Sequence, residues 1–142
     1  MNHKTRYVFD TNVVISALLF NNSIPGQAFF RAVDDGIILM SQSLAEELDD
    51  VLAREKFNRY VTLEEREQFL EGLIRESELV EITDTVRACR DAKDDRTLEL
   101  AVNGNAAFIV SGDDDLLILN PFRGIQIVTP SQLLELINKQ ET

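Results

Sequence analysis

The chain has 142 residues, of which 44% are hydrophobic and 27% are charged, which is the balance of an ordinary globular domain. No apolar run approaches the roughly 20 residues needed to span a bilayer, and the first residues lack the pattern of a cleaved signal peptide, so neither a membrane span nor a secreted protein is expected. The net charge of −11 argues against binding nucleic acid through bulk electrostatics alone, because phosphate binders are usually basic.

Short β-rich runs alternate with helix-like segments along the chain, which we treat as one domain of residues 1–142. The expected strands are 7–9, 37–40, 79–82, 108–110 and 125–128, all apolar enough to be buried in a parallel sheet. Capping boxes at 43–46, 62–65 and 129–132 mark helix starts, the last with Pro130 at the first helical position. The alternation predicts a three-layer α/β/α sandwich around a mostly parallel sheet of about five strands.

Ligands of such folds bind outside the carboxyl ends of the strands, so acidic residues at those ends are candidates for a site. Asp10 directly follows the first expected strand. The alternative role for Asp10 is to cap a helix that begins near Val13, and the two roles are compatible.

Glu47 lies in the helix that we expect to open at Ser43. The apolar face of this helix comprises Leu44, Leu48, Val51 and Leu52. At about 100° per residue, Glu47 falls on the edge of that face while its acidic neighbours point to solvent. The alternative is a boundary glutamate that pairs with a nearby Lys or Arg.

Two further acidic runs adjoin expected helices. Asp94 and Asp95 precede a helix with an apolar stripe, where one of them could serve only as an N-cap or interact with the helix dipole. Asp113 opens a triplet of acids, 113–115, shortly after the fourth strand, where a solvated turn that caps a short helix is the alternative. Acids gathered at one end of a sheet repel one another unless protons or metal ions neutralise them.

The available donors favour a hard cation at such a site. Carboxylate oxygens suit Mg²⁺ and similar ions, which keep several waters and bind through a few carboxylates. Cys89 is the only cysteine and His3, expected at the surface, is the only histidine, so no zinc site or internal disulfide can form. The lone cysteine also favours a cytoplasmic protein.

At these residues the sequence resembles the PIN-domain family over nearly its whole length. The strongest segments are 9–17 (FDTNVVISA) and 109–117 (IVSGDDDLL), with 46–48 (EEL) and 94–101 (DDRTLELA) between them. More narrowly, the chain is similar to the branch that includes the VapC toxins of toxin–antitoxin systems. The order and spacing of the four segments carry the resemblance.

The resemblance implies a metal-dependent ribonuclease that hydrolyses phosphodiester bonds with water activated by Mg²⁺ or Mn²⁺. It implies Asp10, Glu47, Asp95 and Asp113 as catalytic metal ligands, with Asp94 as the alternative to Asp95, since a shift of one residue exchanges them. Asn12, Ser111 and Asp115 match supporting positions. An antitoxin protein and a homodimer are possible partners implied by the family.

Two basic runs could help an acidic protein hold RNA. Arg54, Lys56 and Arg59 follow the Glu47 helix among aromatic residues that could stack a base, and Arg87, Arg90, Lys93 and Arg96 surround the third acid. The proposed substrate contacts are Arg54, Lys56, Arg59 and Arg96. For any single one of these residues, a solvated and salt-bridged surface is the alternative.

Two other functions stay open at this point. A phospho-accepting receiver or aspartate phosphatase also places acids at strand ends and uses Mg²⁺. Such phosphatases usually repeat the aspartate two residues on, where this chain has Asn12, and a receiver needs a lysine late in the sheet, whereas none follows Asp113 until Lys139. A non-catalytic PIN-like binding partner is the second alternative.

Overall fold

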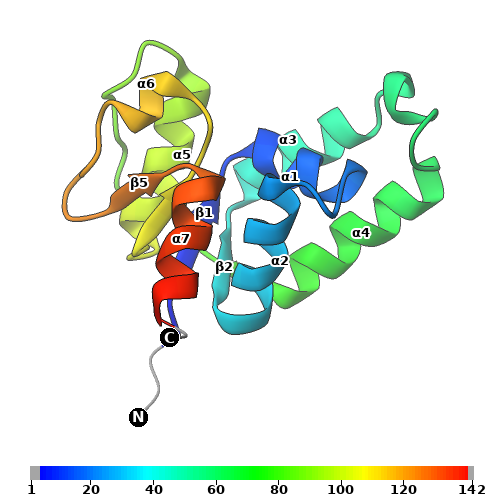
Figure 1. Cartoon of the computed structure of the whole chain (residues 1–142). Coiled ribbons are helices and arrows are strands. Elements are labelled where there is room, and N and C mark those ends of the chain that lie inside the picture. Colours follow the sequence, from blue (N-terminus) through cyan, green and yellow to red (C-terminus); the bar gives the residue numbers. More distant parts are fainter. Residues whose placement is uncertain (1–3, 141–142) are drawn as a thin grey trace.

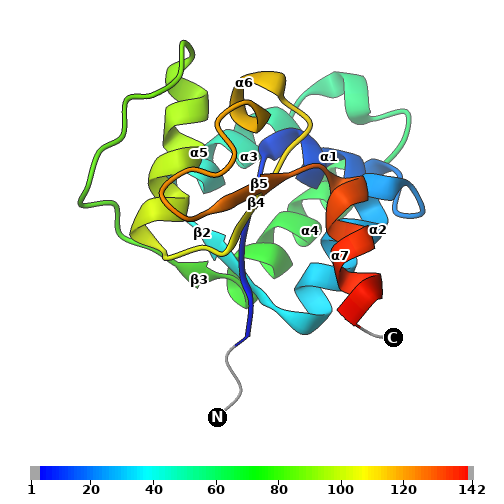
Figure 2. The ribbon, with the colours of Figure 1, turned by 60° about the vertical axis from the view of Figure 1, so that its left-hand side comes forward.

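The computed structural model describes residues 4–140, so His3 lies outside the described part of the chain. Five parallel strands form one sheet in the order β3-β2-β1-β4-β5, with helices on both faces (Figures 1 and 2). The strands are β1 Arg6–Phe9, β2 Ile37–Met40, β3 Glu78–Leu79, β4 Phe108–Val110 and β5 Gln126–Val128. The predicted α/β sandwich with a parallel five-stranded sheet is confirmed.

The helices are α1 Thr11–Leu19, α2 Ile24–Asp35, α3 Gln42–Leu52, α4 Leu63–Glu76, α5 Ala92–Asn103, α6 Asp114–Leu117 and α7 Pro130–Gln140, with a 3₁₀ turn, η1, at Glu55–Phe57. Among residues 4–140 no single helix is long and apolar enough to cross a membrane. Helices α1 and α2 meet that requirement only as a pair, and the pair is bent by 101°.

The sheet is buried on both faces, and successive strand residues face opposite cores. Tyr7 and Phe9 of β1 pack in the core built with α1, α2, α3, α4 and α7, whereas Val8 packs in the core built with α5 and α6. This alternation is the two-residue period of a strand. Figure 1 shows α5 and α6 on one side of β1 and α1, α2 and α4 on the other side. The two cores hold the central strands rigidly, and with them the residues that follow their carboxyl ends.

Two of the three predicted helix starts are confirmed. Thr62 accepts from the backbone N–H of Glu65 at 3.1 Å, and Thr129 and Gln132 exchange hydrogen bonds of 3.1 and 2.9 Å, with Pro130 first in α7. The predicted start at Ser43 is wrong by two residues. Ser41 caps α3, accepting from Leu44 N–H at 3.1 Å, because β2 ends at Met40 and leaves Ser41 in the extended conformation that an N-cap requires.

The third strand is shorter than the predicted 79–82. The backbone N–H of Val80 still donates to the carbonyl of Met40 at 2.8 Å. Beyond that point β2 has ended and its chain has turned into α3, so residues 81–82 have no neighbouring strand with which to pair. The apolar character of residues 79–82 therefore predicts a longer strand than the structure contains.

One buried guanidinium holds the segment that connects α3 to α4. Arg66 of α4 is 1% exposed and donates to the carbonyls of Leu52 and Val61, both at 2.6 Å, and to Asn58 Oδ1 at 3.0 Å. These bonds satisfy backbone carbonyls at the end of α3 and in the following loop, which otherwise lack helical partners.

Replacing Arg66 with Met should lower the free energy of unfolding by about 2–4 kcal/mol, because it leaves buried carbonyls without donors. Urea unfolding followed by circular dichroism measures the effect. Arg75→Met, at an exposed position of the same helix, is the control and should change the free energy by less than about 0.5 kcal/mol. Equal losses in the two variants would show that the buried hydrogen bonds of Arg66 do not stabilise the fold.

Candidate metal centre

The site lies where the adjacent central strands β1 and β4 end. The backbone N–H of Asp10 donates to the carbonyl of Val110 at 3.0 Å, so the residues that follow the two strands lie side by side. Ser111 is fully buried; its hydroxyl donates to Asp10 Oδ2 at 2.7 Å and accepts from the backbone N–H of Asp113 at 3.0 Å. One serine thus connects two acids that are 103 residues apart in the sequence.

Asp10 occupies the N-cap position of α1, but its side chain makes no capping hydrogen bond. It is 7% exposed, and burial raises the pKa of its carboxyl, while the hydrogen bond from Ser111 acts in the opposite direction. The side chain is therefore turned to the strand ends rather than to the first turn of its own helix.

Three carboxylates gather beside Asp10. One oxygen from each of Asp94, Asp113 and Asp115 lies within 4.8 Å of the others. Asp94 comes from the first turn of α5 and is 6% exposed. Asp113 caps α6 by accepting from the N–H of Asp115 at 2.9 Å, so the capping alternative for Asp113 holds together with its place in the cluster.

The neighbouring acids strongly perturb Asp94. Burial and the neighbouring Asp113 carboxylate raise the pKa of Asp94 to about 6, and Asp10 adds to the repulsion. Such a group is costly to keep ionised without a cation. Every donor in the group is a carboxylate oxygen, which fits a hard divalent ion such as Mg²⁺ or Mn²⁺.

Asp95 lies outside this group. Its Oδ1 accepts from the backbone N–H groups of Ala88 at 2.8 Å and Cys89 at 2.7 Å, and these bonds lower the pKa of the Asp95 carboxyl. The N-cap of α5 is Asp91, which accepts from the N–H of Lys93 at 2.9 Å, so neither Asp94 nor Asp95 is needed as the cap. Asp94 faces the acid cluster and Asp95 fastens the loop before the helix.

Glu47 lies on the edge of the apolar face of α3, as predicted, and it is half-buried. Both of its oxygens have protein partners: the hydroxyl of Thr11 donates to Oε2 at 2.8 Å, and Lys93 Nζ lies 3.0 Å from Oε1. The ion-pair alternative for Glu47 therefore describes its contacts in this structure. No oxygen of Glu47 belongs to the group formed by Asp94, Asp113 and Asp115 among the described residues.

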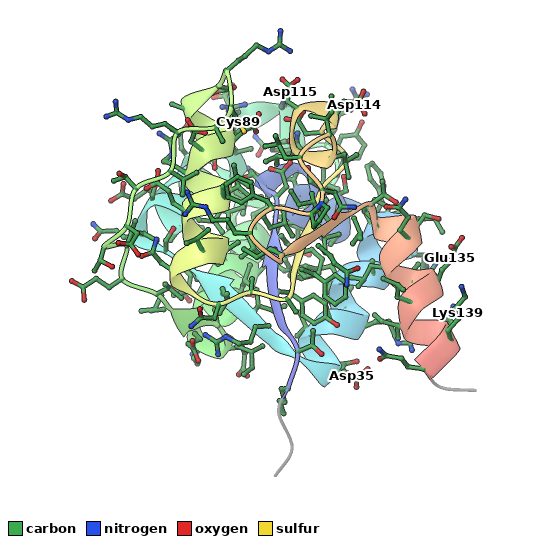
Figure 3. All side chains as sticks on the ribbon, turned by 90° about the vertical axis from the view of Figure 1, so that its left-hand side faces the viewer. Asp35, Cys89, Asp114, Asp115, Glu135 and Lys139 are labelled. Atoms are coloured by element: carbon green, nitrogen blue, oxygen red, sulfur yellow. The ribbon has the colours of Figure 1, made fainter. Side chains whose placement is uncertain are left out.

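A second cation contacts the acids at the solvent side. Arg90 Nη2 lies 2.9 Å from Asp115 Oδ1, and the Arg90 side chain is 87% exposed. Figure 3 shows Asp115 and Cys89 near each other at one end of the molecule, with Asp114 on α6 beside them. Burial and the surrounding acids, Asp95 first, raise the pKa of the Cys89 thiol to about 11, which excludes a reactive thiolate there near neutral pH.

The remaining predicted residues are exposed or contact other parts of the protein. Asn12 is exposed, and within residues 4–140 its side chain has no hydrogen-bond partner. Arg54 pairs with Asp50 at 3.8 Å, while Lys56 and Arg59 lie over the rings of their neighbours Phe57 and Tyr60 at 5.2 and 5.6 Å. Arg96 is exposed and lines a small pocket together with Glu47 and Lys93.

The sequence does not predict Thr11 as a site residue, because it stands between two stronger candidates. It predicts Lys93 only as a member of a basic run and not as the partner of Glu47. Asp91 gives the signal that could have placed Lys93: an aspartate three residues before Asp94 is an N-cap candidate, and it sets which side chains of the first turn face the strand ends.

Comparison with known proteins identifies the fold and the family. A family model described as PIN domain matches residues 6–115, which include all of the acids described above. The uncharacterised protein MJ1680 of Methanocaldococcus jannaschii is 29% identical over 146 aligned positions, which cover 96% of this chain and 94% of that protein.

Two solved structures share the fold at low identity. One is VapBC2 from Rickettsia felis bound to a DNA fragment from their promoter, with a TM-score of 0.62, 12% identity, and coverage of 88% of this chain and 98% of that chain. The other is PAE2754 from Pyrobaculum aerophilum, with a TM-score of 0.51, 15% identity, and coverage of 95% and 90%. The match over 6–115, on a fold with acids gathered at the ends of its central strands, shows that the chain belongs to the PIN-domain family, a family of nucleases.

Proposed function

We propose that the protein is a metal-dependent endoribonuclease that hydrolyses phosphodiester bonds with Mg²⁺ or Mn²⁺. The observation that carries the proposal is the carboxylate group of Asp94, Asp113 and Asp115 beside buried Asp10, at the carboxyl ends of β1 and β4. Acids this close serve no obvious packing purpose and destabilise the ionised state of Asp94. A divalent cation used for nuclease chemistry would explain why these acids lie together.

Asp94, Asp113 and Asp115 are the proposed direct ligands, with Asp10 as the fourth carboxylate. We propose Asp94 in preference to Asp95 because the oxygen of Asp95 already accepts two backbone N–H groups. The family pattern predicts Glu47 as a further ligand, but both of its oxygens already contact Thr11 and Lys93, so we do not propose it as a direct ligand. Ser111 would orient Asp10 through its 2.7 Å hydrogen bond.

A divalent cation bound there would act as a Lewis acid on the scissile phosphate and lower the pKa of a bound water. The protein's own cations would then hold the polyanion. Of the four predicted RNA contacts, Arg96 shares a pocket with Glu47 and Lys93. Arg54, Lys56 and Arg59 are proposed as contacts for more distant parts of the RNA, and binding through so few cations should weaken with salt.

The biological role that we propose is the toxin of a toxin–antitoxin pair, with an antitoxin protein as partner and a homodimer as a possible assembly. The structural likeness to VapBC2 supports this role, together with the resemblance of segments 9–17 and 109–117 to the branch that includes the VapC toxins. The PIN-domain match over residues 6–115 argues against the receiver and phosphatase alternatives.

Cleavage of a mixed single-stranded RNA pool should require Mn²⁺ or Mg²⁺ and stop in EDTA. Asp10→Asn and Asp94→Asn should each lower the rate by about 100-fold or more, since each removes a charge from the metal centre without changing side-chain size. Asp114→Asn is the matched control, because Asp114 is an exposed member of the same acidic triplet. A parallel single-stranded DNA pool tests the choice of RNA, and metal-independent cutting, or equal cutting by Asp10→Asn, would contradict the proposal.

The metal-free protein should be stabilised at neutral pH by Asp94→Asn. The pKa of Asp94 rises from its ordinary value of 3.8 to about 6 in the folded state, so the folded chain keeps this proton to higher pH than the unfolded chain does. The free energy of unfolding therefore falls as the pH rises from about 4 through 6, and at pH 7.5 the loss amounts to roughly 1–3 kcal/mol.

Thermal unfolding in EDTA at pH 7.5 and 4.5 measures this effect. Asp94→Asn should raise Tm at pH 7.5 relative to wild type, and the gain should shrink towards zero at pH 4.5, where Asp94 is already protonated in the folded protein. Asp114→Asn is the control, because it lowers the net negative charge by the same amount at an exposed position and so measures the gain in Tm that comes from net charge alone. Equal gains for Asp94→Asn and Asp114→Asn at both pH values would show that Asp94 is not under strain from its neighbours.

A further inference from the structure

One ion pair crosses the site between two helices that are distant in sequence. Lys93 lies in the first turn of α5, and its Nζ is 3.0 Å from Glu47 Oε1 on α3. The side chains of Lys93 and Glu47 are 39% and 20% exposed, so the pair lies at the boundary between the interior and solvent. A pair that is partly shielded from water is screened less than an exposed one.

The same ion pair lies beside Asp10. Thr11, which follows Asp10 in the chain, donates its hydroxyl to Glu47 Oε2 at 2.8 Å. The Lys93 ammonium at Glu47 Oε1 therefore supplies positive charge close to the end of β1 as well as to α3.

The acids of the site fall into two groups by their partners. Glu47 is neutralised by Lys93 and receives a second hydrogen bond from Thr11, so both of its oxygens are engaged. Asp94 and Asp113 contact each other and have no Lys or Arg within ion-pair distance among the described residues. Among residues 4–140, Asp115 of the same cluster is paired only with Arg90, whose side chain is 87% exposed. A divalent cation gains most where negative charge is least balanced, which is on the Asp94 side.

We propose that Lys93 is a positioning residue that holds Glu47 as its counter-ion and restricts the centre to one divalent cation, bound on the Asp94–Asp113–Asp115 side. This inference rests on the proposed metal centre and defines its stoichiometry. At Glu47 Oε1 the Lys93 ammonium takes the position that a second metal ion bound by Glu47 would need. One N–H of the ammonium is used by Glu47, which leaves donors for an anionic oxygen of a bound substrate.

Mn²⁺ binding to the intact protein, measured by isothermal titration calorimetry, tests the inference without any cleavage assay. The wild type and Glu47→Gln should each bind one Mn²⁺, with Kd values within about threefold, because Glu47 is not a ligand. Lys93→Met should raise the stoichiometry from one towards two, since it frees Glu47 beside Asp10. Lys93→Arg should keep one ion, because it preserves the cation.

Asp94→Asn and Asp114→Asn complete the set. Asp94→Asn should raise Kd by about tenfold or more, and Asp114→Asn should leave it within about threefold of wild type. Circular dichroism shows that each variant is folded before titration.

Three results would each overturn the inference: two Mn²⁺ ions bound by the wild type, a Kd raised tenfold by Glu47→Gln, or unchanged stoichiometry and affinity in Lys93→Met. If Asp94→Asn also leaves binding unchanged, or the wild type binds no Mn²⁺, the proposed metal centre itself fails. The two failures are therefore distinguishable.

Discussion

The site depends on the pairing of β1 with β4 in the middle of the sheet. The hydrogen bond from the Asp10 N–H to the Val110 carbonyl extends that pairing by one residue and brings the two strand ends together. Ser111, the first residue after β4, then donates its hydroxyl to Asp10 Oδ2 at 2.7 Å. Without this pairing, segments about 100 residues apart would have no reason to present carboxylates to the same point.

Confining like charges at that point has an energetic cost that the surrounding structure offsets in two ways. Backbone and hydroxyl donors stabilise some of the acids, as Ser111 does for Asp10 and the 88–89 loop does for Asp95. Lysine and arginine neutralise others, namely Glu47 and Asp115. Among residues 4–140 Asp94 has neither kind of partner, and its raised pKa marks the place where a cation would relieve the most repulsion.

This uneven neutralisation also reconciles the net charge of −11 with action on a polyanion. Four carboxylates gather at the strand ends, where a divalent cation would lower the local negative charge, while Lys93, Arg96 and Arg90 border the acids from the α5 side. A nucleic-acid strand at the strand ends would therefore meet several cations close to the acid cluster, although the chain as a whole is acidic.

The sequence by itself determined the parts that depend on local physics. Apolar runs and capping boxes predict the five strands and two of the three helix starts tested above, because period and cap chemistry act within a few residues. The position of acids after buried strands likewise predicts where a site forms. The weakest local predictions were the end of β3 and the cap of α3, since both depend on where β2 stops.

Only the tertiary structure decided which acids face one another. Asp94 and Asp95 are adjacent in sequence and differ by about 100° around α5, and the Asp91 cap and the packing of that helix fix which one turns to Asp113. The pairing of Glu47 with Lys93 likewise joins two helices whose separation and rotation follow from packing on the sheet. Sequence spacing supplies the carboxylates, but their division into the cluster of Asp94, Asp113 and Asp115 and the ion-paired Glu47 arises from distances across helices that no local pattern encodes.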